Sequence, residues 1–238
     1  MYRVTLISDT HGKHNQLTDD LPGGDILIHA GDAMTSGYYQ EEFTSFAKWY
    51  DQLNHYEHKI FIAGNHCRLF ENEPETMRGL LTGYKNIDYL EDEELVLYHD
   101  GSNGDIPEDN IRIYGSPYQP AFFDWAFNLP RNGPELAEKW AAIPDNTDIL
   151  ITHGPSWGYN DTTQYDRNRH LGCELLRERI DVIRPKIHVS GHIHSGHGHY
   201  FDGHTHHFNA SVLNERYNYA NKPFTFDWDH ITNEIVWR

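Results

Sequence analysis

The chain has 238 residues, a formal net charge of −17 and only two cysteines, Cys67 and Cys173. This length is enough to bury a sizeable core without disulfides, and two cysteines so far apart in sequence form no disulfide framework, which favours a reducing compartment. The negative charge argues against a broad grip on nucleic acid, because that needs clustered Lys and Arg.

The hydropathy of the chain predicts a cytoplasmic protein with no membrane partner. Met1 leads straight into the first strand without an apolar leader, and no run approaches membrane-spanning length. Neither repeats nor linkers interrupt the pattern, so residues 1–238 are predicted to form one domain. Its oligomeric state stays open.

The first predicted strand, Val4–Ile7, ends abruptly in polar residues. Asp9 and His11 are two positions apart, so in an extended segment their side chains lean the same way and reach one point. A carboxylate and an imidazole together suit a divalent ion of the Mn, Fe or Zn type. Alone, the pair also fits a capping Asp and a turn His. Because similar segments recur along the chain, we favour a metal site.

Two further apolar runs repeat this arrangement. The run 25–30 leads into Gly31-Asp32, which in isolation is an ordinary turn, and the run 59–63 leads into Gly64-Asn65-His66. An Asn side-chain carbonyl is a metal ligand, and the adjacent His would point elsewhere, free to act on a substrate. Between these runs, apolar residues at helical spacing over 38–55 predict a helix whose aromatic stripe is core.

The middle of the chain carries weaker patterns. Its predicted elements are a helix over 71–81, a short strand over 86–90, a solvated acidic turn over 91–94, an antiparallel pair of strands over 95–99 and 111–114, and a helix over 134–142. The last helix begins at Pro134, where a missing amide donor does no harm.

Two long connections lack a clear period. Residues 115–128 are rich in Pro and aromatics, and two interpretations stay open: a loop that covers a substrate, or a hydrophobic plug beneath the connection. The loop 156–170 is a second segment able to cover a site. Aromatic residues in these loops are candidates to stack on a nucleotide base: Tyr118, Phe122, Trp125 and Trp157.

Two later strands deliver histidines. The run 148–152 precedes His153-Gly154, and the run 186–190 precedes Gly191-His192-Ile193-His194. His192 and His194 alternate as Asp9 and His11 do, so both imidazoles are able to reach one point. A helix is predicted between the two strands, over 173–180.

The remaining histidines gather near the end of the chain. They lie in a hairpin-like stretch around Gly203, where surface strand histidines are favoured over a second metal site: His197, His199, His204, His206 and His207. Strands over 208–211 and 235–237 complete the predicted elements.

The strand-end segments form an ordered set: Asp9-x-His11, Gly31-Asp32, Gly64-Asn65-His66, His153-Gly154 and Gly191-His192-x-His194. From the first strand to about residue 211, this set resembles the motifs of the calcineurin-like metallophosphoesterase superfamily. Three further stretches are similar to its small metallophosphoesterase-domain branch: Gly115-Ser116-Pro117, Phe127-Asn128-Leu129-Pro130 and Asn209-Ala210-Ser211.

The resemblance implies an α/β fold, a four-layer α/β/β/α sandwich with two divalent metal ions at the carboxyl ends of the strands. Mn is the favoured metal, with Fe, Zn, Ni and Mg as alternatives. The resemblance assigns one ion to Asp9, His11 and His194, the other to Asn65, His153 and His192, and a bridging role to Asp32. His66 matches the family's catalytic histidine. Asn65 and His66 would contact the substrate, and Arg68 fits either a phosphate contact or, preferably, a structural arginine.

The implied activity is hydrolysis of phosphodiesters or small phosphomonoesters by a metal-bridging hydroxide, with His66 assisting. A nucleotide-like diester is the favoured substrate. The alternative is a non-catalytic scaffold that binds metals, a nucleotide or a partner protein, which would be expected to lack ligands or His66. Protein phosphatase activity is disfavoured because the segment after Asp32 lacks an Asp-Arg-Gly continuation. Extended nucleic acid is disfavoured by the charge.

Overall fold

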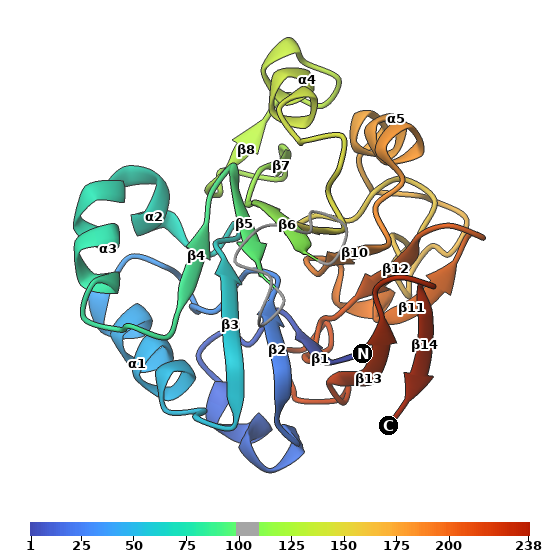
Figure 1. Ribbon diagram of the computed structural model, residues 1–238. Helices are drawn as coiled ribbons and strands as arrows, with labels where there is room; N and C mark the ends of the chain where they lie inside the picture. The colour runs from blue at the N-terminus through green and yellow to red at the C-terminus, as the bar shows by residue number, and fades with distance from the viewer. Residues whose placement is uncertain (99–109) are drawn as a thin grey trace.

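Two sheets lie face to face with helices on both outer sides (Figure 1). The computed structural model describes residues 1–98 and 110–238. Among these residues the strands form two six-stranded sheets and one two-stranded sheet of β7 (Gln119–Pro120) and β8 (Asn128–Leu129). No helix in this part of the chain is both long and apolar enough to cross a membrane.

The first sheet contains the strands that begin and end the chain. Its order is β14 (Glu234–Trp237), β13 (Phe224–Asp229), β1 (Tyr2–Ile7), β2 (Gly24–His29), β3 (Tyr56–Ile62) and β4 (Asp88–Leu90). Strands β1 to β4 are parallel, whereas β13 pairs antiparallel with both β1 and β14. The carboxyl ends of β1, β2 and β3 therefore meet at one edge.

The second sheet repeats this plan. Its order is β11 (Gly198–Phe201), β12 (His206–Asn209), β10 (Ile187–Ser190), β9 (Ile149–Thr152), β6 (Ile111–Ser116) and β5 (Glu93–Leu97). The four central strands are parallel, and β11 and β5 pair antiparallel at the edges.

Strands covered on both faces have continuous apolar sequences, because neither face meets water. In β1, Val4 and Leu6 point into the core between the sheets, whereas Ile7 points into the core beneath the helices. Opposite them, β9 contributes Ile149 and Ile151 to the core between the sheets. All of these side chains are fully buried.

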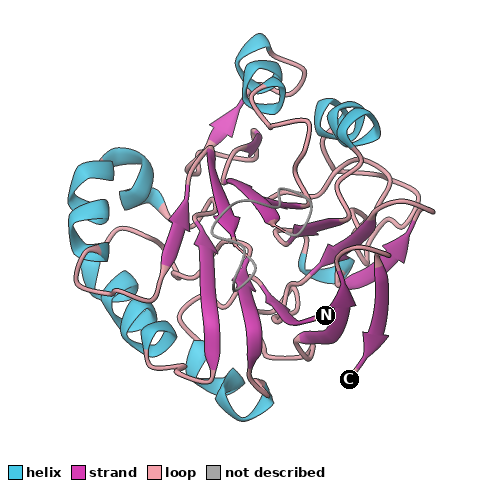
Figure 2. Ribbon diagram, in the orientation of Figure 1, coloured by secondary structure: helices cyan, strands magenta, loops and turns pink. Residues whose placement is uncertain are grey.

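Helices cover the two outer faces, as the secondary-structure view shows (Figure 2). The first sheet packs against η1 (His14–Asp20), α1 (Gln40–Asp51), α2 (Arg68–Asn72) and α3 (Pro74–Leu81). The second packs against α4 (Pro134–Ala141) and α5 (Glu174–Ile183). The predicted four-layer α/β/β/α sandwich is confirmed, as is the aromatic stripe of α1, whose Phe43, Phe46 and Tyr50 are fully buried.

The helix predicted over 71–81 is confirmed for Pro74–Leu81 but does not run unbroken from residue 71. The chain instead forms α2 and α3, separated at Glu73, which has φ −134° and ψ 52°. Glu73 precedes Pro74, and the proline ring disfavours helical geometry in the residue before it. Pro74 then starts α3, where its missing amide is not needed.

The antiparallel pair is confirmed as β5 and β6, but positions 99–109 of its predicted strand and loop lie outside the described residues. The acidic turn is not merely solvated, because Asp92 accepts hydrogen bonds from Ser116 Oγ at 2.7 Å and Lys139 Nζ at 2.6 Å. Strand β13 was not predicted, although Phe224-Thr-Phe-Asp-Trp-Asp alternates as a half-buried strand does.

Candidate metal centre

The polar residues that follow five parallel strands meet in one place. Those strands are β1, β2 and β3 of the first sheet and β9 and β10 of the second, and ligands in α/β folds bind at such carboxyl ends. The side chains brought together are those of Asp9, His11, Asp32, Asn65, His66, His153, His192 and His194. All the residues assigned to the metals by resemblance therefore lie in one cluster.

The backbone at the centre is held in an unusual conformation. Asp9, His11, Asp32 and His192 have φ values of 55°, 40°, 56° and 65°, in the left-handed region that non-glycine residues rarely adopt. Cross-strand hydrogen bonds hold two of them, from Asp9 N–H to Gly31 O and from His11 N–H to Asp32 O, both 3.0 Å. Such strain gathers at functional sites, where it directs side chains that extended backbone would turn away.

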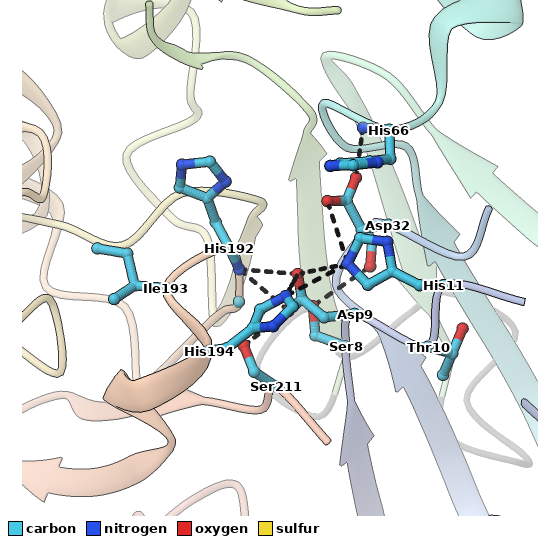
Figure 3. A network of polar contacts seen from close by, with 12 residues as sticks. Ser8, Asp9, Thr10, His11, Asp32, His66, His192, Ile193, His194 and Ser211 are labelled. Carbon is cyan, nitrogen blue, oxygen red and sulfur yellow. Dashed lines mark hydrogen bonds and ion pairs between the residues drawn. The ribbon is translucent and has the colours of Figure 1, made fainter. Parts of the chain in front are cut away.

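Asp9, His11 and His194 form the first group of candidate ligands (Figure 3). His194 Nε2 lies 3.4 Å from Asp9 Oδ1 and 3.2 Å from His11 Nε2. Asp9 is fully buried, and its Oδ2 accepts a hydrogen bond from Ser211 Oγ at 2.7 Å. The structure adds Ser211 to the site as a residue that orients a candidate ligand.

Asn65, His153 and His192 form the second group. Asn65 Oδ1 lies 2.9 Å from His153 Nε2 and 2.8 Å from His192 Nδ1. Asp32 connects the two groups, because its Oδ2 is 3.2 Å from His153 Nε2 and 3.8 Å from His11 Nε2. This position suits the bridging role that the resemblance implies.

The hydrogen bonds of the rings show that the centre suits cations. Backbone carbonyls accept from Nδ1 of His11 (Met34 O, 3.2 Å), His153 (Ala30 O, 2.9 Å) and His194 (Asn214 O, 3.0 Å). In each neutral ring Nε2 is therefore the lone-pair nitrogen, and it points at carboxylate, amide or imidazole acceptors. Acceptors that converge in a buried site require a positive charge between them. A divalent ion supplies that charge, and carboxylate, amide and imidazole groups are ligands that bind such ions.

Without metal, protons take the place of that charge. Burial lowers the pKa of His153, but neighbouring Asp32 outweighs it and raises the value to about 9. Burial likewise opposes ionisation of His194, and its hydrogen bond to Asp9 raises the pKa to about 9. The pKa of His11 is instead lowered to about 4, mainly by burial.

Metal binding is therefore expected to release protons. Near pH 7 the metal-free protein carries protons on His153 and His194, since both have pKa values of about 9, and ligation of their Nε2 atoms displaces about two protons. Release should shrink, and affinity for Mn²⁺ should level off, as the pH rises through about 9. Anaerobic calorimetry in buffers of different ionisation enthalpy measures this, and release that is independent of pH would contradict it.

His66 lies beside the candidate metal ligands and is held by two hydrogen bonds and a stacked ring. Its backbone N–H donates to Asp32 Oδ1 at 2.7 Å, and its Nδ1 lies 2.6 Å from the Thr35 carbonyl, to which it donates. Trp125 stacks on the ring at 4.1 Å between centroids and 25° between planes. Neither ring contact uses Nε2. Trp125, predicted to stack on a base, stacks on this histidine instead.

A cavity of about 580 Å³ opens over the cluster. Its wall includes Gln119, Phe122 and Tyr217 besides His66 and five of the candidate ligands: His11, Asp32, Asn65, His192 and His194. Gln119 and Tyr217 were not predicted as site residues. Nothing in the local sequence marks Gln119 as a site residue. Tyr217 has φ 57° and follows a turn, and its ring contacts those of His11 and His194.

Residues 115–128 have a buried part and a part that borders the cavity. Ala126 and Phe127 are fully buried, as a plug would be. Phe122 instead lies in the cavity wall, its ring edge-on to His192 at 5.7 Å.

Three predicted substrate contacts lie away from the cavity wall. Arg68 donates to the Asp124 carbonyl and lies over the Tyr38 ring at 5.4 Å. Tyr118 packs against buried side chains and lies beneath Lys139 Nζ at 3.9 Å. Trp157 contacts His170, with 4.8 Å between ring centroids. From loop 156–170, Thr163 and Arg169 do reach the wall.

The late histidines are less exposed than predicted. His206 and His207 are buried, because β12 lies inside the second sheet, between β11 and β10. His207 bonds Asp202 at 3.0 Å, and His206 bonds His199 at 3.0 Å and the Asn233 carbonyl at 3.1 Å. Within residues 1–98 and 110–238, the groups able to hold a metal all belong to the main cluster.

A four-layer sandwich with acceptor side chains converging at strand carboxyl ends is typical of metal-dependent phosphoesterases. The family model for calcineurin-like phosphoesterase matches residues 2–196. The chain belongs to the calcineurin-like phosphoesterase family.

Curated relatives share most of this chain. It is 39% identical to human metallophosphoesterase domain-containing protein 1, across 94% of this chain and 70% of that protein. It is 35% identical to the Caenorhabditis elegans UPF0046 protein T07D4.2, across 94% of this chain and 59% of that protein.

Solved structures share the fold at low identity. A protein from Thermus thermophilus has a TM-score of 0.63 at 11% identity, covering 99% of this chain and 97% of that one. A dimetal phosphatase from Danio rerio has a TM-score of 0.54 at 11% identity, covering 94% and 92%.

Proposed function

We propose that this protein is a dinuclear-metal phosphoesterase that hydrolyses phosphodiesters or small phosphomonoesters, with a nucleotide-like diester as the favoured substrate. The observation that carries the proposal is Asp32, whose carboxylate lies between two groups of buried acceptors. Mn²⁺ is the metal we favour for these nitrogen and oxygen ligands. When bound, two such ions supply Lewis acidity toward phosphoryl oxygens and lower the pKa of water.

The candidate ligands fall into two sets that share one carboxylate. Asp9, His11 and His194 would hold one ion, Asn65, His153 and His192 the other, and Asp32 both. Seven protein ligands would leave room for the substrate's phosphate, which would also contact Asn65 and His66.

His66 has the geometry of an acid beside the leaving group. Donation from Nδ1 to the Thr35 carbonyl fixes the ring, so a second proton would sit on Nε2, within the cavity wall. From there the imidazolium can stabilise charge on the phosphoryl group and give its proton to the departing oxygen. Stacking on Trp125 also helps to hold the ring in this orientation.

The position of Phe122 favours a substrate whose organic group is aromatic or nucleotide-like. Its side chain is 51% exposed and forms part of the cavity wall, so a flat ring entering the cavity can pack against it.

Replacing His66 by Ala is expected to lower Mn²⁺-dependent turnover of bis-p-nitrophenyl phosphate by about 10²–10⁴-fold, the usual contribution of a general acid. Turnover by metal-stripped and Mn²⁺-loaded protein gives the comparison, and p-nitrophenyl phosphate gives the diester preference. His204→Ala is the matched control, because His204 is exposed and remote from the cavity wall. Equal turnover by the two variants, or none by Mn²⁺-loaded wild type on either ester, would sink the proposal.

A further inference from the structure

Gln119 lies in the cavity wall, yet its side-chain carbonyl has no partner. The residue is 1% exposed, and Oε1 forms no hydrogen bond. It lies beside Gly154, since a Cβ atom at Gly154 would be 3.7 Å from Oε1. A buried acceptor left unpaired costs about 1–3 kcal/mol, so nearly all such atoms are paired in folded proteins. Gln119 Oε1 belongs to neither group of candidate metal ligands.

The orientation of the Gln119 amide is determined by Asn128. Nδ2 of Asn128 donates to the carbonyls of Phe122 and Phe123, at 3.2 and 3.0 Å. Its Oδ1 accepts from Phe122 N–H and from Gln119 Nε2, both at 3.3 Å. Because Asn128 cannot be flipped without losing these bonds, Gln119 must present Nε2 to it and keep Oε1 as the free acceptor.

The same Asn128 positions an aromatic neighbour. Its bonds to Phe122 N–H and the Phe122 carbonyl hold this residue where its ring borders the cavity, edge-on to His192. Gln119 and Phe122 therefore line the same cavity, beside the candidate metal ligands, and the unpaired acceptor of Gln119 lies just beneath the cavity surface. A ligand group that satisfies both is flat and carries a hydrogen-bond donor.

We propose that Gln119 and Phe122 form a subsite for the organic part of the substrate, selecting a flat group that bears an N–H or O–H donor. This inference rests on the proposed phosphoesterase function. A site built to accept a hydrogen bond rejects an analogue without the donor, because the acceptor is then buried unpaired. Gln119 would determine specificity by contacting the organic group of the substrate, and it would not contact the reacting phosphorus.

The test measures the binding of adenosine monophosphate and three analogues to Mn²⁺-loaded protein by titration calorimetry. Each analogue lacks one donor: the purine amino group, or one or the other ribose hydroxyl. For wild type, one deletion is expected to weaken binding about tenfold or more. For Gln119→Leu the same deletion should cost less than about twofold, because the partner is gone.

Two further variants make the result decisive. Gln16→Leu makes the same change at an exposed residue of η1 and should keep the wild-type discrimination. Gln119→Met repeats the measurement with a more adaptable side chain, should thermal unfolding show that the Leu variant is poorly folded. Wild type that binds all four nucleotides alike, or Gln119 variants that keep full discrimination, would overturn the subsite.

Turnover of bis-p-nitrophenyl phosphate by the same wild-type preparation separates this inference from the proposed function. That ester carries no donor, so its KM includes the cost of leaving Gln119 Oε1 unpaired, and the turnover is therefore measured at saturating ester, where kcat reports on the metal centre. Donor discrimination without turnover leaves the subsite in place and removes the phosphoesterase. Turnover without donor discrimination leaves the phosphoesterase function in place and removes the subsite.

Discussion

Asp32→Asn is expected to abolish metal-dependent turnover, lowering it by more than about 10³-fold. The carboxylate has a different neighbour on each oxygen: Oδ1 accepts from His66 N–H at 2.7 Å, and Oδ2 lies 3.2 Å from His153 Nε2. An amide removes the negative charge that would hold two cations together. It also places an NH₂ donor against a backbone N–H or against a histidine that needs its lone pair.

Metal content separates this explanation from a loss of folding. Elemental analysis of the Asn variant should find fewer than two ions per chain, while thermal unfolding of the metal-free protein still shows one cooperative transition. Asp19→Asn, on the exposed side of η1, makes the same change in charge and should retain both ions and turnover. Retention of two ions and of near-normal turnover by Asp32→Asn would remove the bridging role.

Gly191→Ala is expected to lower the free energy of unfolding by about 3 kcal/mol and to weaken metal binding. A Cβ atom here would lie 2.0 Å from Ser8 Oγ and 2.2 Å from Asp9 Oδ2. Neither atom is free to move. Ser8 Oγ donates to the Ala30 carbonyl at 3.1 Å, and Asp9 Oδ2 accepts from Ser211 Oγ at 2.7 Å. Relief of the clash must therefore displace a candidate ligand.

Two measurements check this substitution. The melting temperature should fall by roughly 5–10 °C, and calorimetric titration should show weaker Mn²⁺ binding. Gly79→Ala is the control, because no atom lies within 4 Å of its added Cβ and the residue is exposed in α3. There alanine should stabilise the helix by about 0.5–1 kcal/mol. A Gly191→Ala protein with wild-type melting and metal affinity would show that Asp9 tolerates displacement.

Local pattern was enough to predict most of the strands and the candidate metal ligands that follow them. Apolar runs such as Val4–Ile7 and 148–152 are read from the sequence because strands buried on both faces need apolar residues at every position. The polar residues after them could be grouped because parallel strands end at a common edge. The break at Glu73 was not predicted, although Pro74 after it is a signal for such a break.

Other features depend on contacts between distant segments. Gln119 is an unremarkable residue in sequence, and only the contact with Asn128 and the burial beside Gly154 leave its carbonyl unpaired in the cavity. Trp125 was expected to meet a base, but the fold of its loop stacks it on His66. No local periodicity records such pairings, because each partner comes from a different loop.

The sequence alone identified the candidate ligands, since apolar runs followed by Asp, Asn and His specify buried strands with acceptors at their ends. Tertiary structure decided how those acceptors meet. Packing of the two sheets places β1 to β3 beside β9 and β10, and the left-handed backbone at Asp9 and His192 turns the side chains inward. These conformations are costly for single residues. They persist because the surrounding sandwich is rigid, and a one-dimensional pattern does not contain that constraint.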